Sequence, residues 1–189
     1  MRQQLRQIRC ALPRNAQRKA ATAVARRLGR HPLFKPGARI GVYLALPGEL
    51  NLQDFIRMAW GRHCQLFVPH ITSVRRKQMM FYRYAPAHAL QANHWGIPQL
   101  RNPQQRMPAI MLDVVLVPTV GFDRHGHRLG MGAGFYDRHF AHLRRLRHWR
   151  RPRLIGAAYA CQEVPALAAR AHDVRLDMIV TERAMIRPR

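Results

Sequence analysis

The chain has 189 residues, and its 33 Lys and Arg against 9 Asp and Glu give a formal net charge of +24. A hydrophobic content of 48% excludes extended disorder, the lack of an apolar run of about eighteen residues excludes a membrane-spanning helix, and three scattered cysteines exclude a disulfide framework. We therefore expect one cytoplasmic domain over residues 1–189, folded around its own core.

The first part of the chain alternates helical and strand patterns. Residues 1–30 are amphipathic and Arg-rich, which predicts an amino-terminal helical segment broken near Pro13. The apolar run of residues 38–46 predicts a buried strand. Apolar positions spaced along residues 52–59 predict a helix, and residues 64–69 predict the next strand.

The second part continues this alternation around one very apolar strand. Residues 79–84 predict a short strand at a sheet edge, and residues 85–108 predict a loop. Residues 112–117 are almost continuously apolar, as in a parallel strand covered on both faces. A helix and two strands are expected at residues 136–150, 154–160 and 178–181. The order predicts a three-layer α/β sandwich with a mostly parallel central sheet, in which ligands bind beyond the carboxyl ends of the strands.

The glycine-rich stretch after the strand at residues 112–117 is the strongest functional signal. Gly130, Gly132 and Gly134 can adopt conformations closed to other residues and expose successive N–H groups, which together suit a phosphate. A helix start directly afterwards would add free N–H groups, and Arg128 and Arg138 flank the loop. The same glycines could instead only pack a tight strand-to-helix connection. The spacing is neither a P-loop nor a dinucleotide fingerprint.

Carboxylates near this loop are candidate metal ligands. Asp137 follows the loop directly, and Asp177 precedes the last strand. Magnesium prefers a few carboxylates together with phosphate oxygens and water. Alternatively, Asp137 is a charge at a helix start and Asp177 is a strand-end cap. Asp123, which brackets a turn with Gly126, is expected to bond the backbone of that turn.

The residues of this loop resemble the signature of the 5-formyltetrahydrofolate cyclo-ligase family, whose members are also called methenyltetrahydrofolate synthetases. The resemblance covers essentially the whole chain. Its most specific residues are Phe122, Asp123, Gly126, Gly132, Gly134 and residues 128–130 and 136–138, with residues 95–98 and 173–181 as further matching segments.

The resemblance implies an α/β sandwich and an ATP- and magnesium-dependent reaction. In that reaction 5-formyltetrahydrofolate, including polyglutamylated forms, becomes 5,10-methenyltetrahydrofolate through a phosphorylated formyl intermediate, and ADP and phosphate are released. Such a phosphoryl transfer is catalysed by positioning the substrates and neutralising the phosphate charge, so no protein nucleophile is needed. We expect a monomer with a small-molecule substrate and without a membrane or nucleic-acid partner.

The resemblance also implies roles for individual residues. Arg128 and Tyr136 would be catalytic, and Asp137 and Asp177 would hold magnesium. ATP would contact Arg2, Arg6, Arg128, Leu129, Gly130, Met131, Gly132, Ala133, Gly134, Phe135 and Tyr136. The folate would contact Leu44, Glu49, Met131, Gly132, Ala133, Gly134 and Phe135.

Some loop positions depart from the family pattern. Met131 and Ala133 stand in a loop where many members carry a basic residue, so charge compensation is expected from Arg128, Arg138, Arg6 and magnesium. Arg2 stands where lysine is common, and arginine binds phosphate in a forked geometry. Phe135 keeps an aromatic ring but lacks the hydroxyl of a frequent tyrosine.

Two other classes of protein remain as alternatives. The first is a basic RNA-binding protein without catalysis, supported only by charge, since no RNA-binding signature is present. The arginine-rich residues 144–153 could attract RNA phosphate or an acidic polyglutamate tail. The second is a sugar-phosphate or coenzyme A transferase, which needs a catalytic Glu or Lys, and here only Glu49 lies near an expected pocket.

Overall fold

A computed structural model describes residues 1–93, 96–141, 152–168 and 173–188. Its centre is an eight-stranded sheet with the order β12-β11-β10-β7-β1-β2-β3-β6. The five neighbouring strands that pair in parallel are β11 (Met178–Val180), β10 (Arg153–Ala157), β7 (Val114–Pro118), β1 (Arg39–Gly41) and β2 (Gln65–Ser73). The antiparallel strands at the two edges are β12 (Met185–Ile186), β3 (Gln78–Tyr84) and β6 (Arg106–Met107).

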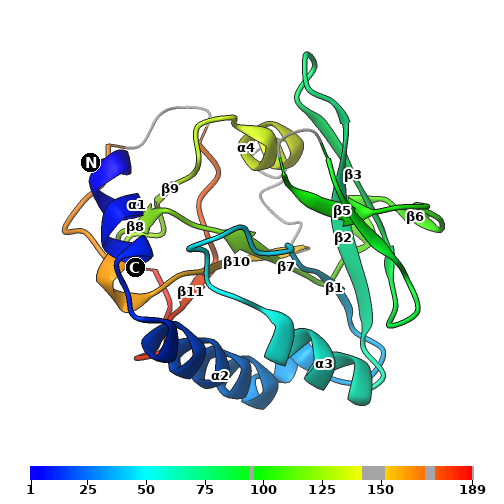
Figure 1. Ribbon diagram of the computed structural model, residues 1–189, viewed down its shortest axis with the longest axis horizontal. Helices are drawn as coiled ribbons and strands as arrows, with labels where there is room; N and C mark the ends of the chain where they lie inside the picture. Colours follow the sequence, from blue (N-terminus) through cyan, green and yellow to red (C-terminus); the bar gives the residue numbers. More distant parts are fainter. Residues whose placement is uncertain (94–95, 142–151, 169–172, 189) are drawn as a thin grey trace.

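Helices cover the two faces of the sheet in separate layers (Figure 1). On one face lie α2 (Arg14–Arg30) and α3 (Gln53–Gly61), while α4 (Phe135–Phe140) and the hairpin of β8 (Gly121–Phe122) and β9 (Arg128–Leu129) lie on the other. Strand β7 shows why both layers form. Val114 and Leu116 belong to the core under α2 and α3, whereas Val115 and Val117 belong to the core on the opposite face. The predicted α/β sandwich with a mostly parallel sheet is confirmed.

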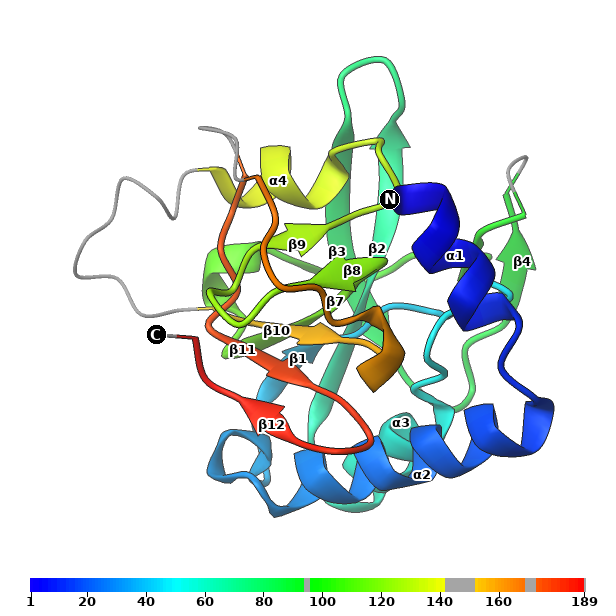
Figure 2. The same ribbon diagram turned by 90° about the vertical axis from the view of Figure 1, so that its left-hand side faces the viewer.

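The amino-terminal helical segment divides into two helices with different tasks. Helix α2 buries one face against the sheet, while α1 (Arg2–Cys10) packs against the short helix η4 (Ala160–Gln162) that follows β10. Leu5 of α1 also reaches Gly121, just beyond β7. Figure 2 shows α1 standing beside the β8–β9 hairpin, apart from the layer of α2 and α3. Helix α1 is therefore placed at the carboxyl ends of the central strands.

Residues 85–108 do not form the simple loop that their composition predicts. They contain a hairpin of β4 (Leu90–Ala92) and β5 (Pro98–Leu100), and β6 then pairs with β3, so that β3 is not the edge of the sheet. Strand β4 has only three residues, all of them exposed, and such a run is too short for an alternation of apolar and polar residues to indicate a strand. The predicted strand at residues 38–46 shortens to β1, because the chain leaves the sheet for a turn.

The remaining described elements are short. They are η1 (Pro32–Phe34) and η2 (Ala109–Met111). The predicted helix at residues 136–150 is observed as α4 over Phe135–Phe140, and residues 142–150 of that prediction lie outside the described residues. None of the helices in the described ranges is long and apolar enough to cross a bilayer.

Candidate functional site

A cavity of about 1020 Å³ lies beyond the carboxyl ends of the parallel strands, where the fold predicts a ligand. It brings together segments that are far apart in the chain: the start of α1, the turn after β1, the β2–β3 hairpin and the glycine loop. The predicted residues that line it are Arg2, Leu44, Glu49, Arg128, Leu129, Gly130, Met131, Gly132, Ala133, Gly134, Phe135, Tyr136, Asp137 and Arg138.

The glycine loop faces a different cation at each of its three glycines. Gly132 and Gly134 have φ angles of +108° and +72°, which side chains of L residues rarely adopt. A Cβ on Gly130 would lie 3.1 Å from a guanidinium nitrogen of Arg128, and one on Gly132 would lie 3.3 Å from a guanidinium nitrogen of Arg2. A Cβ on Gly134 would lie 4.0 Å from Nζ of Lys77. The loop is therefore a bare backbone ringed by positive charge, which suits an anion.

Arg128 joins the loop to the carboxylate behind it. Its Nη2 donates to Oδ1 of Asp137 at 2.7 Å, and its guanidinium lies 5.8 Å from the ring centre of Tyr136. The N–H of Val174 also donates to Oδ1 of Asp137, at 3.3 Å. Burial and then the charge of Glu49 raise the pKa of Tyr136, despite the nearby Arg128 cation, so the phenol keeps its proton. The phenol of Tyr136 can therefore donate a hydrogen bond to an anion.

Glu49 occupies the other side of the cavity, on the turn that follows β1. Gly48 has a φ of +79°, and a Cβ there would collide with Cys10, so the turn and α1 fit closely only with glycine. Oε2 of Glu49 accepts the N–H of Leu46 at 3.0 Å. Burial raises the pKa of Glu49, opposed by this hydrogen bond and by the charges of Arg9 and Arg6.

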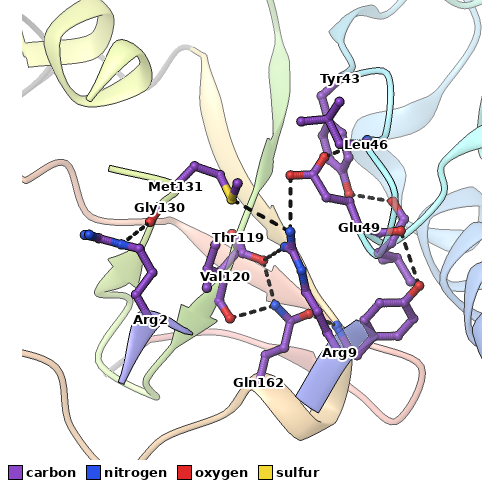
Figure 3. A network of polar contacts seen from close by, with 12 residues as sticks. Arg2, Arg9, Tyr43, Leu46, Glu49, Thr119, Val120, Gly130, Met131 and Gln162 are labelled. Atoms are coloured by element: carbon purple, nitrogen blue, oxygen red, sulfur yellow. Dashed lines mark hydrogen bonds and ion pairs between the residues drawn. The ribbon is translucent and has the colours of Figure 1, made fainter. Parts of the chain in front are cut away.

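Arg9 connects the Glu49 side of the cavity with the glycine loop (Figure 3). Its side chain is almost wholly buried, with Nη2 lying 3.8 Å from Oε1 of Glu49 and 3.8 Å from Sδ of Met131. Nη1 donates to the carbonyl of Thr119 at 3.5 Å, and Gln162 donates to the same carbonyl at 2.7 Å. A single arginine of α1 thus holds both halves of the site against the end of β7.

Asp123 lies outside the cavity and serves the turn beneath the glycine loop, as its position predicts. It is fully buried, and its Oδ1 accepts the N–H groups of His125 and His127 at 2.9 and 3.0 Å. Oδ2 accepts the N–H of Leu167 and contacts Nδ1 of His127, both at 2.9 Å. Burial would raise the pKa of Asp123, but these hydrogen bonds outweigh it and lower the pKa.

Two residues with expected roles do not line the cavity. Arg6 is exposed on α1 and acts on Glu49 through its charge. Asp177 instead joins β10 to β11, because its Oδ1 accepts Arg153 at 2.7 Å and its Oδ2 accepts the N–H of Leu154 at 2.8 Å. The structure does not bring Asp177 together with Asp137 in the cavity. Most of the arginine-rich stretch at residues 144–153 lies outside the described residues.

Sequence reasoning gave no role to several residues of the site, among them Arg9, Tyr43 and Lys77. Arg9 had a local signal, since it follows buried Leu5 by four residues and shares its helix face. Tyr43 lines the cavity, but it lies in the apolar run of residues 38–46, which indicated a buried strand and no binding role. Lys77 had no signal, because its place depends on how the β2–β3 hairpin folds over the loop.

Comparison with known proteins gives a consistent result. The model of the 5-formyltetrahydrofolate cyclo-ligase family matches residues 1–182. The curated 5-formyltetrahydrofolate cyclo-ligase of Haemophilus influenzae is 32% identical over 185 residues, covering 95% of this chain and 95% of its own. That of Escherichia coli K12 is 32% identical over 181 residues, covering 94% and 96%.

Solved structures resemble the fold closely. The NMR structure of the 5,10-methenyltetrahydrofolate synthetase of Aquifex aeolicus superposes with a TM-score of 0.82 at 28% identity, covering 100% of this chain and 91% of the other. The 5,10-methenyltetrahydrofolate synthetase of Mycoplasma pneumoniae gives a TM-score of 0.74 at 23% identity, covering 96% of both, and so supports the fold alone.

Proposed function

Since the chain belongs to the 5-formyltetrahydrofolate cyclo-ligase family, we propose that it cyclises 5-formyltetrahydrofolate to 5,10-methenyltetrahydrofolate with ATP and releases ADP and phosphate. The enzyme is a ligase of one-carbon metabolism. The alternative of a basic RNA-binding protein without catalysis is not favoured by this membership, which accounts for the glycine loop as well as for the fold.

The observation that carries the proposal is that one cavity has an anion-binding end and a carboxylate-bearing apolar end. The glycine loop with its cations supports binding of a triphosphate. Tyr43, Leu44 and Glu49 lie in the same lining, where a flat pteridine ring would meet apolar walls and its N–H groups a carboxylate acceptor. The two substrates would therefore meet inside one cavity.

In the proposed reaction the formyl oxygen attacks the terminal phosphorus of ATP. The bond from that phosphorus to the bridging oxygen breaks, and ADP leaves. The neighbouring folate nitrogen then attacks the activated formyl carbon and loses its proton, while the carbon–oxygen bond breaks and phosphate departs. Arg128, Arg2 and the loop amides would neutralise the phosphoryl oxygens, and the protonated phenol of Tyr136 would donate a hydrogen bond.

Asp137 fits a magnesium ion bound together with phosphates. It lines the cavity, and its two hydrogen bonds from described residues fall on Oδ1, so Oδ2 is available as a ligand. Magnesium commonly takes one or two carboxylates plus substrate phosphates, and when bound it offsets their negative charge. The described residues contain no cluster of three or more His, Cys, Asp or Glu that could hold a metal alone. Asp177, with both oxygens already occupied, is less suited.

The test is a direct assay of ring closure. Purified protein is mixed with 5-formyltetrahydrofolate, magnesium and ATP, and the methenyl product is followed by its ultraviolet absorbance. We expect product only when all three are present, with ADP formed in equal amount. The absence of turnover, together with RNA binding that weakens steeply with salt, would instead support the non-catalytic alternative.

A further inference from the structure

We propose that Lys77 is a further phosphate-binding residue of this site, reaching the glycine loop from the β2–β3 hairpin. The inference rests on the proposed ATP-dependent reaction. It adds to the expected phosphate-binding residues one that lies outside both the glycine loop and α1. Lys77 lines the cavity, and its Nζ lies close to Gly134: a Cβ added to that glycine would be 4.0 Å from it. The ammonium group therefore stands over the carboxyl-terminal end of the loop.

The backbone of Lys77 adopts a left-handed conformation that is unfavourable for lysine. Its φ is +52°, and its N–H donates to the carbonyl of Val74 at 3.0 Å to close the turn. Glycine or asparagine fits this left-handed region at lower cost. In the described part of the chain, His63 and Gln105 are the other non-glycine residues with positive φ, and neither lines the cavity. Such an outlier at a cavity points to a role for its side chain.

No carboxylate in the part of the chain that the structure describes compensates the charge of Lys77 by forming an ion pair with it. The two carboxylates of the cavity named above pair with other cations, Glu49 with Arg9 and Asp137 with Arg128. Arg2, a second cation over the loop, likewise has no carboxylate partner within the described ranges, and it bonds a backbone oxygen, that of Gly130, at 2.9 Å. Free positive charge over exposed amides attracts an anion of high charge, which a triphosphate has.

The three cations over the loop come from three separate elements. Arg2 belongs to α1, Lys77 to the β2–β3 turn and Arg128 to β9. A phosphate chain along residues 130–134 would therefore touch all three parts. Lysine contributes a compact charge on a flexible stem, which can follow a phosphoryl group more freely than the fixed fork of arginine.

The decisive variant is Lys77→Gly, because glycine removes the ammonium group and relieves the backbone. If Lys77 binds a phosphate group of ATP, Lys77→Gly should bind ATP about tenfold to a hundredfold more weakly in calorimetric titration. Its affinity for AMP should fall much less. Its free energy of unfolding should be unchanged or higher. Lys77→Arg should recover most of the affinity for ATP.

Arg76→Ala is the matched control, since Arg76 lies in the same turn, is exposed and does not line the cavity. It should bind ATP as the unmodified protein does. Equal ATP affinity in Lys77→Gly and the unmodified protein, or equal losses in Lys77→Gly and Arg76→Ala, would overturn the assignment of Lys77. If the unmodified protein itself did not bind ATP, the proposed function would fail, and this inference would fail with it.

Discussion

Arg128 is the residue where the charge of the glycine loop, the carboxylate of Asp137 and the ring of Tyr136 meet. Sequence reasoning found it from its place beside the loop, and the structure adds that its guanidinium is held in position by Asp137. A donor fixed before the reaction stabilises developing charge without the cost of reorganising.

Replacing this donor tests its role directly. Arg128→Ala should lower kcat by roughly a hundredfold to a thousandfold, the usual effect of removing one preorganised donor to a developing anion. Steady-state rates of methenyl formation measure it. Arg124→Ala is the control, because Arg124 lies in the turn of the same β8–β9 hairpin, pairs with Glu163 and is absent from the cavity lining. Near-normal turnover by Arg128→Ala would remove Arg128 from catalysis.

The two carboxylates expected to bind magnesium can now be separated. Asp137→Asn should raise the magnesium concentration needed for half-maximal rate, because one anionic ligand is lost. Asp177→Asn should leave that concentration unchanged and lower the free energy of unfolding, since its oxygens accept Arg153 and the N–H of Leu154. Magnesium titrations and urea unfolding of both variants give the answer. A shifted magnesium titration for Asp177→Asn would restore the metal role implied by the family resemblance.

At the scale of elements, burial decides which predictions hold. Strand β7 was predictable because four successive apolar residues are buried in it, whereas β4 was not, because it is exposed throughout. The turn at residues 123–127 was also predictable, since an Asp and a Gly at this spacing favour it. The structure adds that the Asp123 carboxylate accepts four contacts, one of them from Leu167 far along the chain.

This turn makes Asp123→Asn a test of stability. The amide NH2 group of asparagine would face N–H donors on one side, so the variant should lose on the order of 3 kcal/mol of unfolding free energy, measured in urea. Glu163→Gln, in a surface ion pair, should lose less than about 1 kcal/mol. A loss for Asp123→Asn no larger than that of this control would contradict the structure.

The pH dependence of Asp123 has a definite sign. Hydrogen bonding lowers the pKa of Asp123 below its ordinary 3.8, so its contribution is present above that pH and is lost as the pH falls through the folded-state pKa. The difference in stability between the unmodified protein and Asp123→Asn should therefore be constant near neutral pH and shrink below about pH 4.

At the scale of the whole molecule, Arg9 ties the amino terminus to both halves of the site. Arg9→Met should cost about 3 kcal/mol of unfolding free energy, because the carboxylate of Glu49 stays buried without its partner. Adding Glu49→Gln to Arg9→Met should recover part of that loss. Arg6→Met is the control, since Arg6 is exposed on the same helix and should change stability little.

Acidic pH should reduce the cost of Arg9→Met. Burial already raises the pKa of Glu49, and loss of the Arg9 charge would raise it further. A raised folded-state pKa gives stability that is present at low pH and is lost as the pH rises through that pKa. Urea unfolding of the variant should thus approach that of the unmodified protein as the pH is lowered towards 4 to 5, and a cost independent of pH would contradict the buried pair.

The sequence by itself determined the α/β alternation, the central strand β7 and the glycine loop, because apolar periodicity and glycine spacing are local properties of the chain. Only the tertiary structure decided that Arg2 and Lys77 join Arg128 around that loop, and that Asp137 lines the same cavity while Asp177 does not. Arg9 and Met131 are 122 positions apart, and no pattern within either segment records that they touch. Asp177 shows the converse, since its position before a strand was equally compatible with a metal ligand and a strand-end cap until its hydrogen bonds to β10 were known.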